Sequence, residues 1–264
     1  MSESKASASG TGRFARAAAK GRFSVLFWML VAALAAPVVI PDGPIVGIVF
    51  SILVLFLMLA GLAAVSSHKR TFWFGVLLAV PAFIMGIVAP IVDIRELSAV
   101  STFLFLVFFV HLAVAMLRHV LKLHHVDAET IYGAVSVYLL MALIWAQAFY
   151  ILALVEPESF HYPDRDELAV VQERRVAEPG WDEPELSEFN WHTVQEHAQG
   201  TMVYYSLVTL TTLGYGDIYP VKDAARILAM LEATLGQLYL VILVARLVGL
   251  YTAVEMERRR QSSA

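Results

Sequence analysis

Residues 212–217, Thr-Leu-Gly-Tyr-Gly-Asp, have the types needed to line a cation path with oxygen atoms. A cation loses its hydration shell in a narrow path, so rings of protein oxygens must replace the water. Successive backbone carbonyls can point to one axis only where the chain adopts unusual φ and ψ angles, which glycine allows. Gly214 and Gly216 alternate with larger residues, and Thr212 adds a hydroxyl oxygen. The spacing predicts a row of oxygens that can replace the water around a cation. An ordinary glycine-rich turn is the alternative, although such a turn does not require Thr, Tyr and Asp in register.

The stretch before this loop, residues 200–211, is short, apolar and aromatic. Non-helical backbone at membrane depth is tolerated only inside protein or against water, so the loop needs a housing. We expect this stretch to be a half-membrane helix that enters from the extracellular face. Its C-terminal end would direct partial negative charge toward the membrane centre.

The composition predicts an all-α integral membrane protein. Hydrophobic residues make up 59% of the 264-residue chain and charged residues 16%, which is too little charge for a soluble surface. Cys is absent, so disulfides and thiolate metal sites are excluded. No basic patch for nucleic acid is visible, and nothing in the pattern indicates an enzyme or a bound cofactor.

Six apolar runs have the length of transmembrane helices, about 17–25 residues. The last is long enough to extend beyond the bilayer on one side. The first also resembles a cleavable signal peptide, but the long tail before it favours a retained helix. The runs are residues 24–40, 44–65, 71–92, 97–117, 131–155 and 224–254.

The Lys and Arg residues of the short loops fall on one side of the membrane if six spans are counted, which predicts that both termini are cytoplasmic. Residues 156–199 then lie outside, extracellular or periplasmic, and there twelve acidic residues stand against three Arg. The basic tail could instead lie on an anionic membrane surface. The cations on the inner side are Arg13, Arg16, Lys20, Arg22, Lys69, Arg70, Arg118, Lys122, Arg258, Arg259 and Arg260.

Residues 205–220 resemble the pore loop of the tetrameric potassium channels, and residues 229–237 resemble the inner helix of bacterial members. The resemblance covers about the C-terminal half of the chain and implies passive K⁺ conduction in a bacterial inner membrane. One chain supplies one loop, so a homotetramer is expected. It further implies that K⁺ is bound by the carbonyls of Thr212, Leu213, Gly214 and Tyr215 and by the Thr212 hydroxyl.

The same resemblance assigns supporting roles around the filter. Asp217 would brace it through a hydrogen bond to an aromatic residue of the pore helix, where the family often has Trp and this chain has Tyr204 and Tyr205. Val208 stands where some members carry an acid, so this filter would depend on other contacts. Thr211 and Gly216 complete the supporting set.

These elements together predict a domain organisation. It comprises a basic tail (1–23), a four-helix membrane domain (24–118), a cytoplasmic linker (119–130), a pore domain (131–254) and a short tail (255–264). Within the pore domain we expect an outer helix (131–155), the acidic segment (156–199), the pore helix and filter (200–217) and an inner helix (223–254).

Conventional voltage sensing is excluded, because the fourth span (97–117) contains no Lys or Arg. His111 in that span could sense pH, and a packed, hydrogen-bonded His is the blander reading. Glu232 could brace the pore helix or raise cation density in the cavity. Gly236 could bend during opening or serve close packing. Gln237, Leu240 and Val244 share a helical face and could line the cavity, while Arg246 would lie near the cytoplasmic mouth.

Three other readings stay open at this point. A K⁺ uptake system is one, although such systems carry four pore loops in one chain. A non-conducting sensor with a vestigial pore is another, and the intact loop argues against it. Metal binding by the outer acids with His161, His192 and His197 is the third, and a solvated loop is the simpler explanation. The gating stimulus and any regulatory ligand or partner cannot be identified from these residues.

Overall fold

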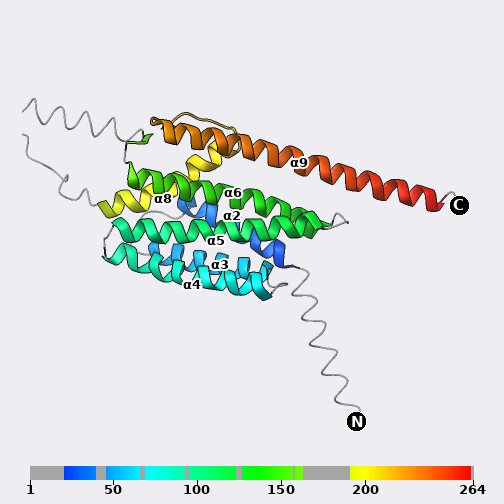
Figure 1. Cartoon of the computed structure of the whole chain (residues 1–264), viewed down its shortest axis with the longest axis horizontal. Helices are drawn as coiled ribbons and strands as arrows, with labels where there is room; N and C mark the ends of the chain where they lie inside the picture. The colour runs from blue at the N-terminus through cyan, green and yellow to red at the C-terminus, as the bar shows by residue number, and fades with distance from the viewer. Residues whose placement is uncertain are drawn as a thin grey trace, which may run out of the picture. The chain divides into compact units, whose positions relative to one another are not determined.

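The computed structural model describes residues 21–39, 46–65, 69–92, 95–122, 127–156, 158–162 and 191–262. The regular secondary structure of these parts is helical except for one small antiparallel sheet (Figure 1). Residues 1–20 of the predicted tail (1–23) and most of the acidic segment (156–199) lie outside them. The helices are α2 (Arg22–Val39), α3 (Val46–Val65), α4 (Lys69–Val92), α5 (Arg95–Lys122), α6 (Ala128–Val155), α8 (Trp191–Leu210) and α9 (Asp223–Ser262), and the strands are β1 (Phe160–His161) and β2 (Tyr219–Pro220).

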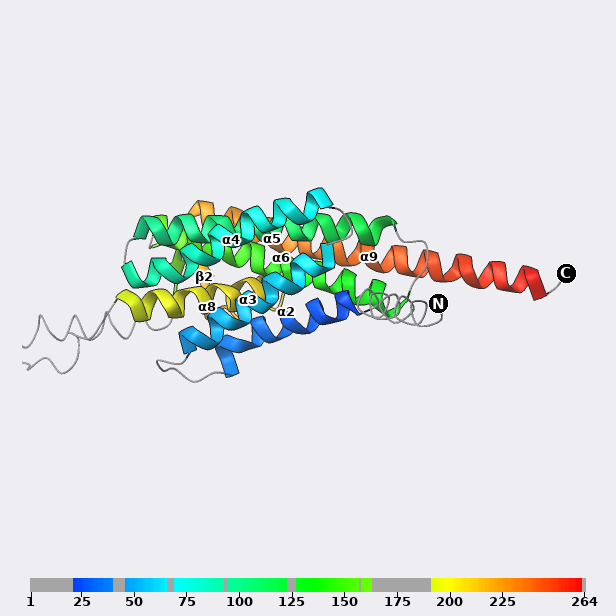
Figure 2. The ribbon, with the colours of Figure 1, turned by 90° about the horizontal axis from the view of Figure 1, so that it is seen from below.

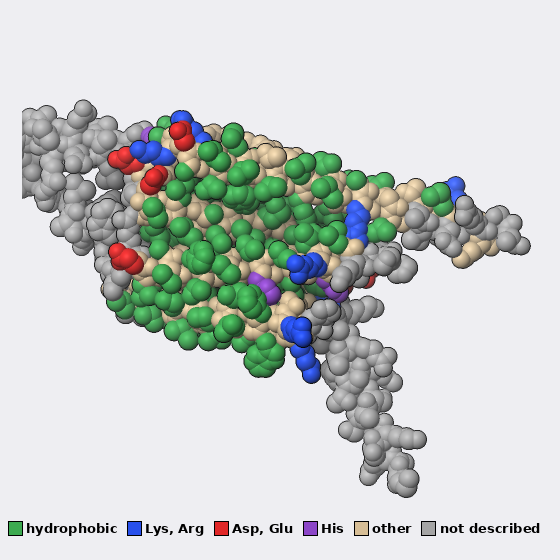
Figure 3. Space-filling view, viewed as in Figure 1, with side chains coloured by type: hydrophobic (Ala, Val, Ile, Leu, Met, Phe, Trp, Pro, Cys, Tyr) green, Lys and Arg blue, Asp and Glu red, His purple; other side chains and the backbone are tan. Residues whose placement is uncertain are grey.

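Four of the described helices are long and apolar enough to cross a membrane, which confirms the all-helical membrane class. More than half of the apolar part of each is exposed in the single chain, and Figure 3 shows many hydrophobic side chains on the helical surface. The apolar parts of α2 and α3 are shorter, so the six-span count stays a prediction. The four spans are Lys69–Ala89, Glu96–Leu121, Ala128–Val155 and Asp223–Thr252.

Three segment boundaries differ from those predicted from the sequence. The inner helix is 40 residues long and continues through most of the tail expected at 255–264. The helix α8 begins at Trp191, well before the expected start at residue 200, and ends at Leu210. The linker expected at 119–130 is shorter, because Asp127 caps α6: its Oδ1 accepts hydrogen bonds from the Thr130 amide at 2.8 Å and the Thr130 hydroxyl at 2.6 Å.

The chain divides into two compact units, and α4, α5, α6 and α9 contribute residues to both. The first comprises Met1–Val80, Phe108–Met141 and Leu240–Ala264. Within it α2 and α3 pack side by side (Figure 2). The first turn of α2 lies against α6, since the Phe23 amide donates to Glu129 Oε2 at 3.2 Å. This contact satisfies one of the amides that a helix N-terminus leaves without an intrahelical partner.

The second unit, Pro81–Val107 and Ala142–Tyr239, contains the loop of interest. Its core joins α6, β1, α8 and α9. Tyr205 packs edge-on against Phe149 and Phe160, with ring centroids 5.0 and 5.3 Å away. Such edge-to-face pairs each add about 0.5–1.5 kcal/mol beyond the area they bury. This cluster fixes α8, and α8 leads directly into residues 211–217. Its buried members are Phe149, Tyr150, Phe160, Met202, Tyr205 and Ala225.

Candidate functional site: the loop after α8

The C-terminus of α8 is closed by backbone hydrogen bonds from the loop. The Leu213 amide donates to the Val208 carbonyl at 2.9 Å, and the Thr212 amide donates to the Thr209 carbonyl at 3.0 Å. This is the pair of bonds of a Schellman motif, whose turning residue adopts a left-handed conformation. Thr212 occupies that position, with φ of 58°. A β-branched residue there is a true outlier, and such strain concentrates at functional sites.

The same bonds set the direction of the loop carbonyls. The amides of residues 211–214 all donate back to carbonyls of α8. No peptide bond of the described chain is cis, and in a trans peptide the C=O points opposite to the N–H. The carbonyls of residues 210–213 therefore point away from the end of α8. Three of them belong to the loop and are available to a ligand.

Left-handed residues alternate along the loop. Thr212, Gly214 and Gly216 have φ of 58°, 61° and 81°, and these are the positive φ values of the described chain. Such an alternation turns successive peptide planes in compensating directions, which lets neighbouring carbonyls face one side. All side chains of 211–217 are exposed in the single chain. An exposed, non-helical loop in a membrane protein requires water or protein against it.

The two tyrosines that precede the loop have different surroundings. The Tyr204 hydroxyl donates to Asp217 Oδ2 at 2.7 Å, which links α8 to the far end of the loop. Tyr205 is buried in the aromatic core with Phe149 and Phe160. Tyr204 therefore makes the contact expected of a bracing aromatic, and Tyr205 holds α8 in place.

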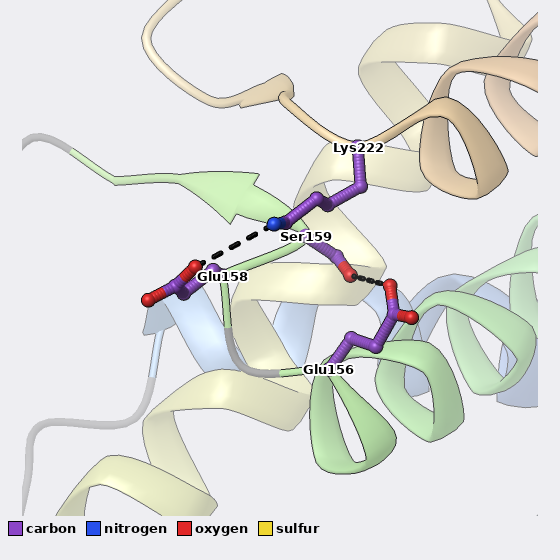
Figure 4. A network of polar contacts seen from close by, with 4 residues as sticks. All are labelled: Glu156, Glu158, Ser159 and Lys222. Carbon is purple, nitrogen blue, oxygen red and sulfur yellow. Dashed lines mark hydrogen bonds and ion pairs between the residues drawn. The ribbon is translucent and has the colours of Figure 1, made fainter.

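A short clasp holds the chain just after the loop, where β1 pairs with β2. The Ser159 carbonyl accepts from the Val221 amide at 2.8 Å. Lys222 Nζ lies 3.6 Å from Glu158, and the Ser159 hydroxyl lies 3.3 Å from Glu156 (Figure 4). Sequence reasoning missed this sheet because two-residue strands leave no alternating pattern. The clasp joins the end of α6 to the start of α9.

Gly236 packs under the base of the loop. A Cβ on Gly236 would lie 2.6 Å from Leu210 Cδ1 and 2.9 Å from the Leu210 carbonyl oxygen. Of the two roles considered for Gly236, this geometry agrees with close packing. One residue farther on, Gln237 Nε2 is 3.4 Å from Thr212 Oγ1. Both contacts tie α9 to the turn at Thr212.

Glu232 does not have the exposure expected of a cavity-lining residue. Its side chain is fully buried, and its Oε1 lies 2.5 Å from the hydroxyl of Ser206 on α8. The expectation of a cavity charge is wrong, and the bracing alternative agrees with this contact. Sequence reasoning missed Ser206, although a hydroxyl inside an apolar helix is a signal that a polar partner lies nearby.

The remaining predicted residues belong to the first unit. Leu240 is half-buried and Val244 is exposed on α9. The His111 Nε2 is 3.1 Å from the Thr71 carbonyl, which agrees with the packed reading, and pH sensing by His111 stays a prediction. Arg246 donates to the Leu121 carbonyl at 2.6 Å, in the last turn of α5, where a cation is favourable.

The outer histidines form no metal cluster in the parts of the chain that are described. His161 stacks on Tyr219 of β2, with ring centroids 4.6 Å apart. The side chains of His192 and His197 lie outside the described residues.

Residues 186–253 match the family model described as "Ion channel". This is about a quarter of the chain, and it contains α8, the loop, β2 and most of α9. No curated protein and no solved structure matches this chain. The matched family is one of ion channels and not of enzymes, and together with the apolar helices it supports an integral membrane protein with an ion channel domain over this segment.

Proposed function

We propose that this chain is a subunit of a potassium-selective channel that conducts K⁺ passively. The observation that carries the proposal is the alternation of positive φ at Thr212, Gly214 and Gly216. It is supported by the direction of the carbonyls at residues 211–213 and by the ion channel match over residues 186–253. In the proposed filter, K⁺ meets the carbonyls of residues 212–215 and the Thr212 hydroxyl in place of water.

We propose further that four copies surround one pore. A single chain offers one loop, and one row of carbonyls cannot encircle an ion. The exposure of α9 supports an assembly. In the single chain 11% of the apolar segment of α9 is buried, against 44% of the apolar segment of α6. Partner chains and lipid would together cover this surface.

The proposed membrane arrangement has six spans, with both termini cytoplasmic and the clasp on the outer side, in a bacterial inner membrane. Support comes from exposed cations at helix ends. Lys69 is the first residue of α4, and Arg259 lies in the last turn of α9. Trp73, 66% exposed in the first turns of α4, suits a membrane interface. Gating by a conventional voltage sensor is not part of the proposal, because the fourth span has no Lys or Arg.

The proposal is tested by reconstituting the full chain in liposomes with opposed K⁺ and Na⁺ gradients. We expect K⁺ flux that greatly exceeds Na⁺ flux from a tetramer verified by mass. The assay is repeated over a range of pH, because the gating stimulus is not specified by the residues. Equal K⁺ and Na⁺ flux, or no flux from a verified tetramer at any pH, would reject the proposed function.

Replacing Tyr204 with Phe tests the brace at the outer end of the loop. The variant keeps the ring and removes the hydroxyl that donates to Asp217. We expect a severalfold loss of K⁺ over Na⁺ selectivity, because the end of the filter loses a fixed contact to α8. Ion flux into liposomes measures the change.

Tyr205→Phe is the matched control for this variant. It also removes a tyrosine hydroxyl, but the Tyr205 ring packs on Phe149 and Phe160 and makes no contact with Asp217 among those described. Selectivity should therefore stay near wild type in the control. Equal selectivity in both variants and in the wild type would show that the Tyr204 contact does not hold the filter.

A further inference from the structure

Ser206 lies at the centre of three helices in the second unit. Its hydroxyl oxygen is 2.8 Å from the carbonyl oxygen of Ala142 on α6 and 2.5 Å from Oε1 of Glu232 on α9. Ser206 and Glu232 are both fully buried. These two contacts connect α8, which leads into the proposed filter, with α6 and α9.

The hydrogens of these two contacts can be counted. Oxygen atoms approach within 2.8 Å only when a hydrogen lies between them. The Ala142 carbonyl has no hydrogen to give, and a serine hydroxyl has one. If that hydrogen goes to Ala142, the 2.5 Å contact needs a second hydrogen, which must come from Glu232. If it goes to a Glu232 carboxylate instead, two acceptor oxygens face each other at 2.8 Å.

The surroundings of Glu232 favour the arrangement in which it supplies the hydrogen. None of the ion pairs in the described part of the chain includes Glu232, and its electrostatic neighbours there are Ser206 and Tyr205 on α8. The second carboxyl oxygen, Oε2, is buried without a hydrogen-bond partner among the described residues. A buried carboxylate with neither a counter-charge nor a second donor is strongly disfavoured.

We propose that Glu232 is a neutral carboxylic acid whose O–H donates to Ser206, and that this two-bond chain to Ala142 positions α8. The proposal rests on the proposed function in one respect, namely that α8 carries the filter. Glu232 is then a positioning residue for K⁺ conduction, acting through Ser206 on the helix whose last turn holds Thr212.

Substitutions at Glu232 separate a neutral donor from a required charge. Gln has the same length and carries an N–H that can donate to Ser206, so Glu232→Gln should keep K⁺ flux, selectivity and thermal stability near wild type. Glu232→Ala leaves Ser206 without its donor and creates a cavity, so flux should fall about tenfold or more and the assembly should melt at a lower temperature. Glu232→Asp keeps a carboxyl group on a shorter side chain that cannot reach Ser206, so its flux and stability should be close to those of Glu232→Ala.

Glu255→Ala is the matched control, because Glu255 lies on the same helix and pairs at the surface with Arg259. It should leave flux and melting near wild type. If Glu232→Gln loses as much flux and stability as Glu232→Ala, a charge is required at this position and the proposal is overturned.

An infrared measurement tests the protonation without using conduction. The carbonyl stretch of a buried protonated carboxylic acid should appear at neutral pH in the difference spectrum of wild type minus Glu232→Gln. Its absence would overturn the neutral acid even if the channel conducts. The wild type could also conduct no K⁺ while the infrared band is present and the Glu232 variants keep the expected order of melting temperatures. In that case the proposed function fails, and the assignment of Glu232 as a neutral acid is retained.

Discussion

Replacing Gly214 with alanine is expected to abolish K⁺ flux while the assembly still forms. Gly214 has φ of 61°, and a Cβ there would meet nothing within 4 Å. The penalty is therefore one of backbone conformation and not of crowding. An L-residue pays about 1–2 kcal/mol in the left-handed region, and in a tetramer the penalty falls on one carbonyl ring four times. The alanine at position 214 should relax toward negative φ, which would turn the carbonyls of this ring away from the pore axis. Liposome K⁺ flux and the mass of the assembly measure the two effects.

Gly249→Ala is the control, because Gly249 does not have a positive φ. A Cβ on Gly249 also meets nothing within 4 Å, but Gly249 lies inside α9 and has no positive φ. Alanine is a better helix former than glycine by about 1 kcal/mol, so this variant should conduct and be at least as stable as wild type. Wild-type conduction by Gly214→Ala would refute the assignment of the filter.

The unusual backbone conformation at the two glycines of the loop could be predicted because it depends on consecutive residues. A row of carbonyls needs glycine at alternate positions, and both Gly214 and Gly216 have positive φ. The third left-handed residue, Thr212, was not foreseeable from its type, since β-branched residues avoid that region. Its conformation follows from the way the last turn of α8 is closed by the Leu213 amide, which is a property of the helix end.

The partners of the loop were harder to predict because they depend on which face each helix buries. The α9 helix is apolar on all sides in its membrane part, so hydrophobic periodicity does not indicate an inward face. The sequence therefore left two roles open for Glu232, in the cavity or as a brace of the pore helix, and the packing against Ser206 that buries it completely could not be predicted. The boundary at residue 200 differs for a related reason: residues 191–199 are polar and were assigned to the acidic segment, whereas α8 runs without a break from Trp191 to Leu210.

Replacing Gly236 with alanine is expected to reduce K⁺ flux strongly and to lower the melting temperature of the assembly. The new Cβ would lie 2.6 Å from Leu210 Cδ1 and 2.9 Å from the Leu210 carbonyl oxygen. The Leu210 side chain can rotate away, but the Leu210 carbonyl belongs to the peptide that joins α8 to Thr211 and cannot move without the loop. Overpacking of this kind costs about 1–3 kcal/mol. Relief requires that the base of the loop move, which would displace the Thr212 oxygens.

The thermal measurement distinguishes close packing from a bending role for Gly236. A glycine that serves only as a hinge has room for a methyl group, so alanine would change the open fraction and leave the melting temperature unchanged or raised. Close packing predicts that flux and stability fall together, while Gly249→Ala, with open space around its Cβ, loses neither. A second variant, Gly236→Ala with Leu210→Ala, removes the flexible contact and leaves the carbonyl in place. Because the rigid contact is the one that moves the loop, this double variant should not recover flux; recovery would assign the effect to the Leu210 side chain.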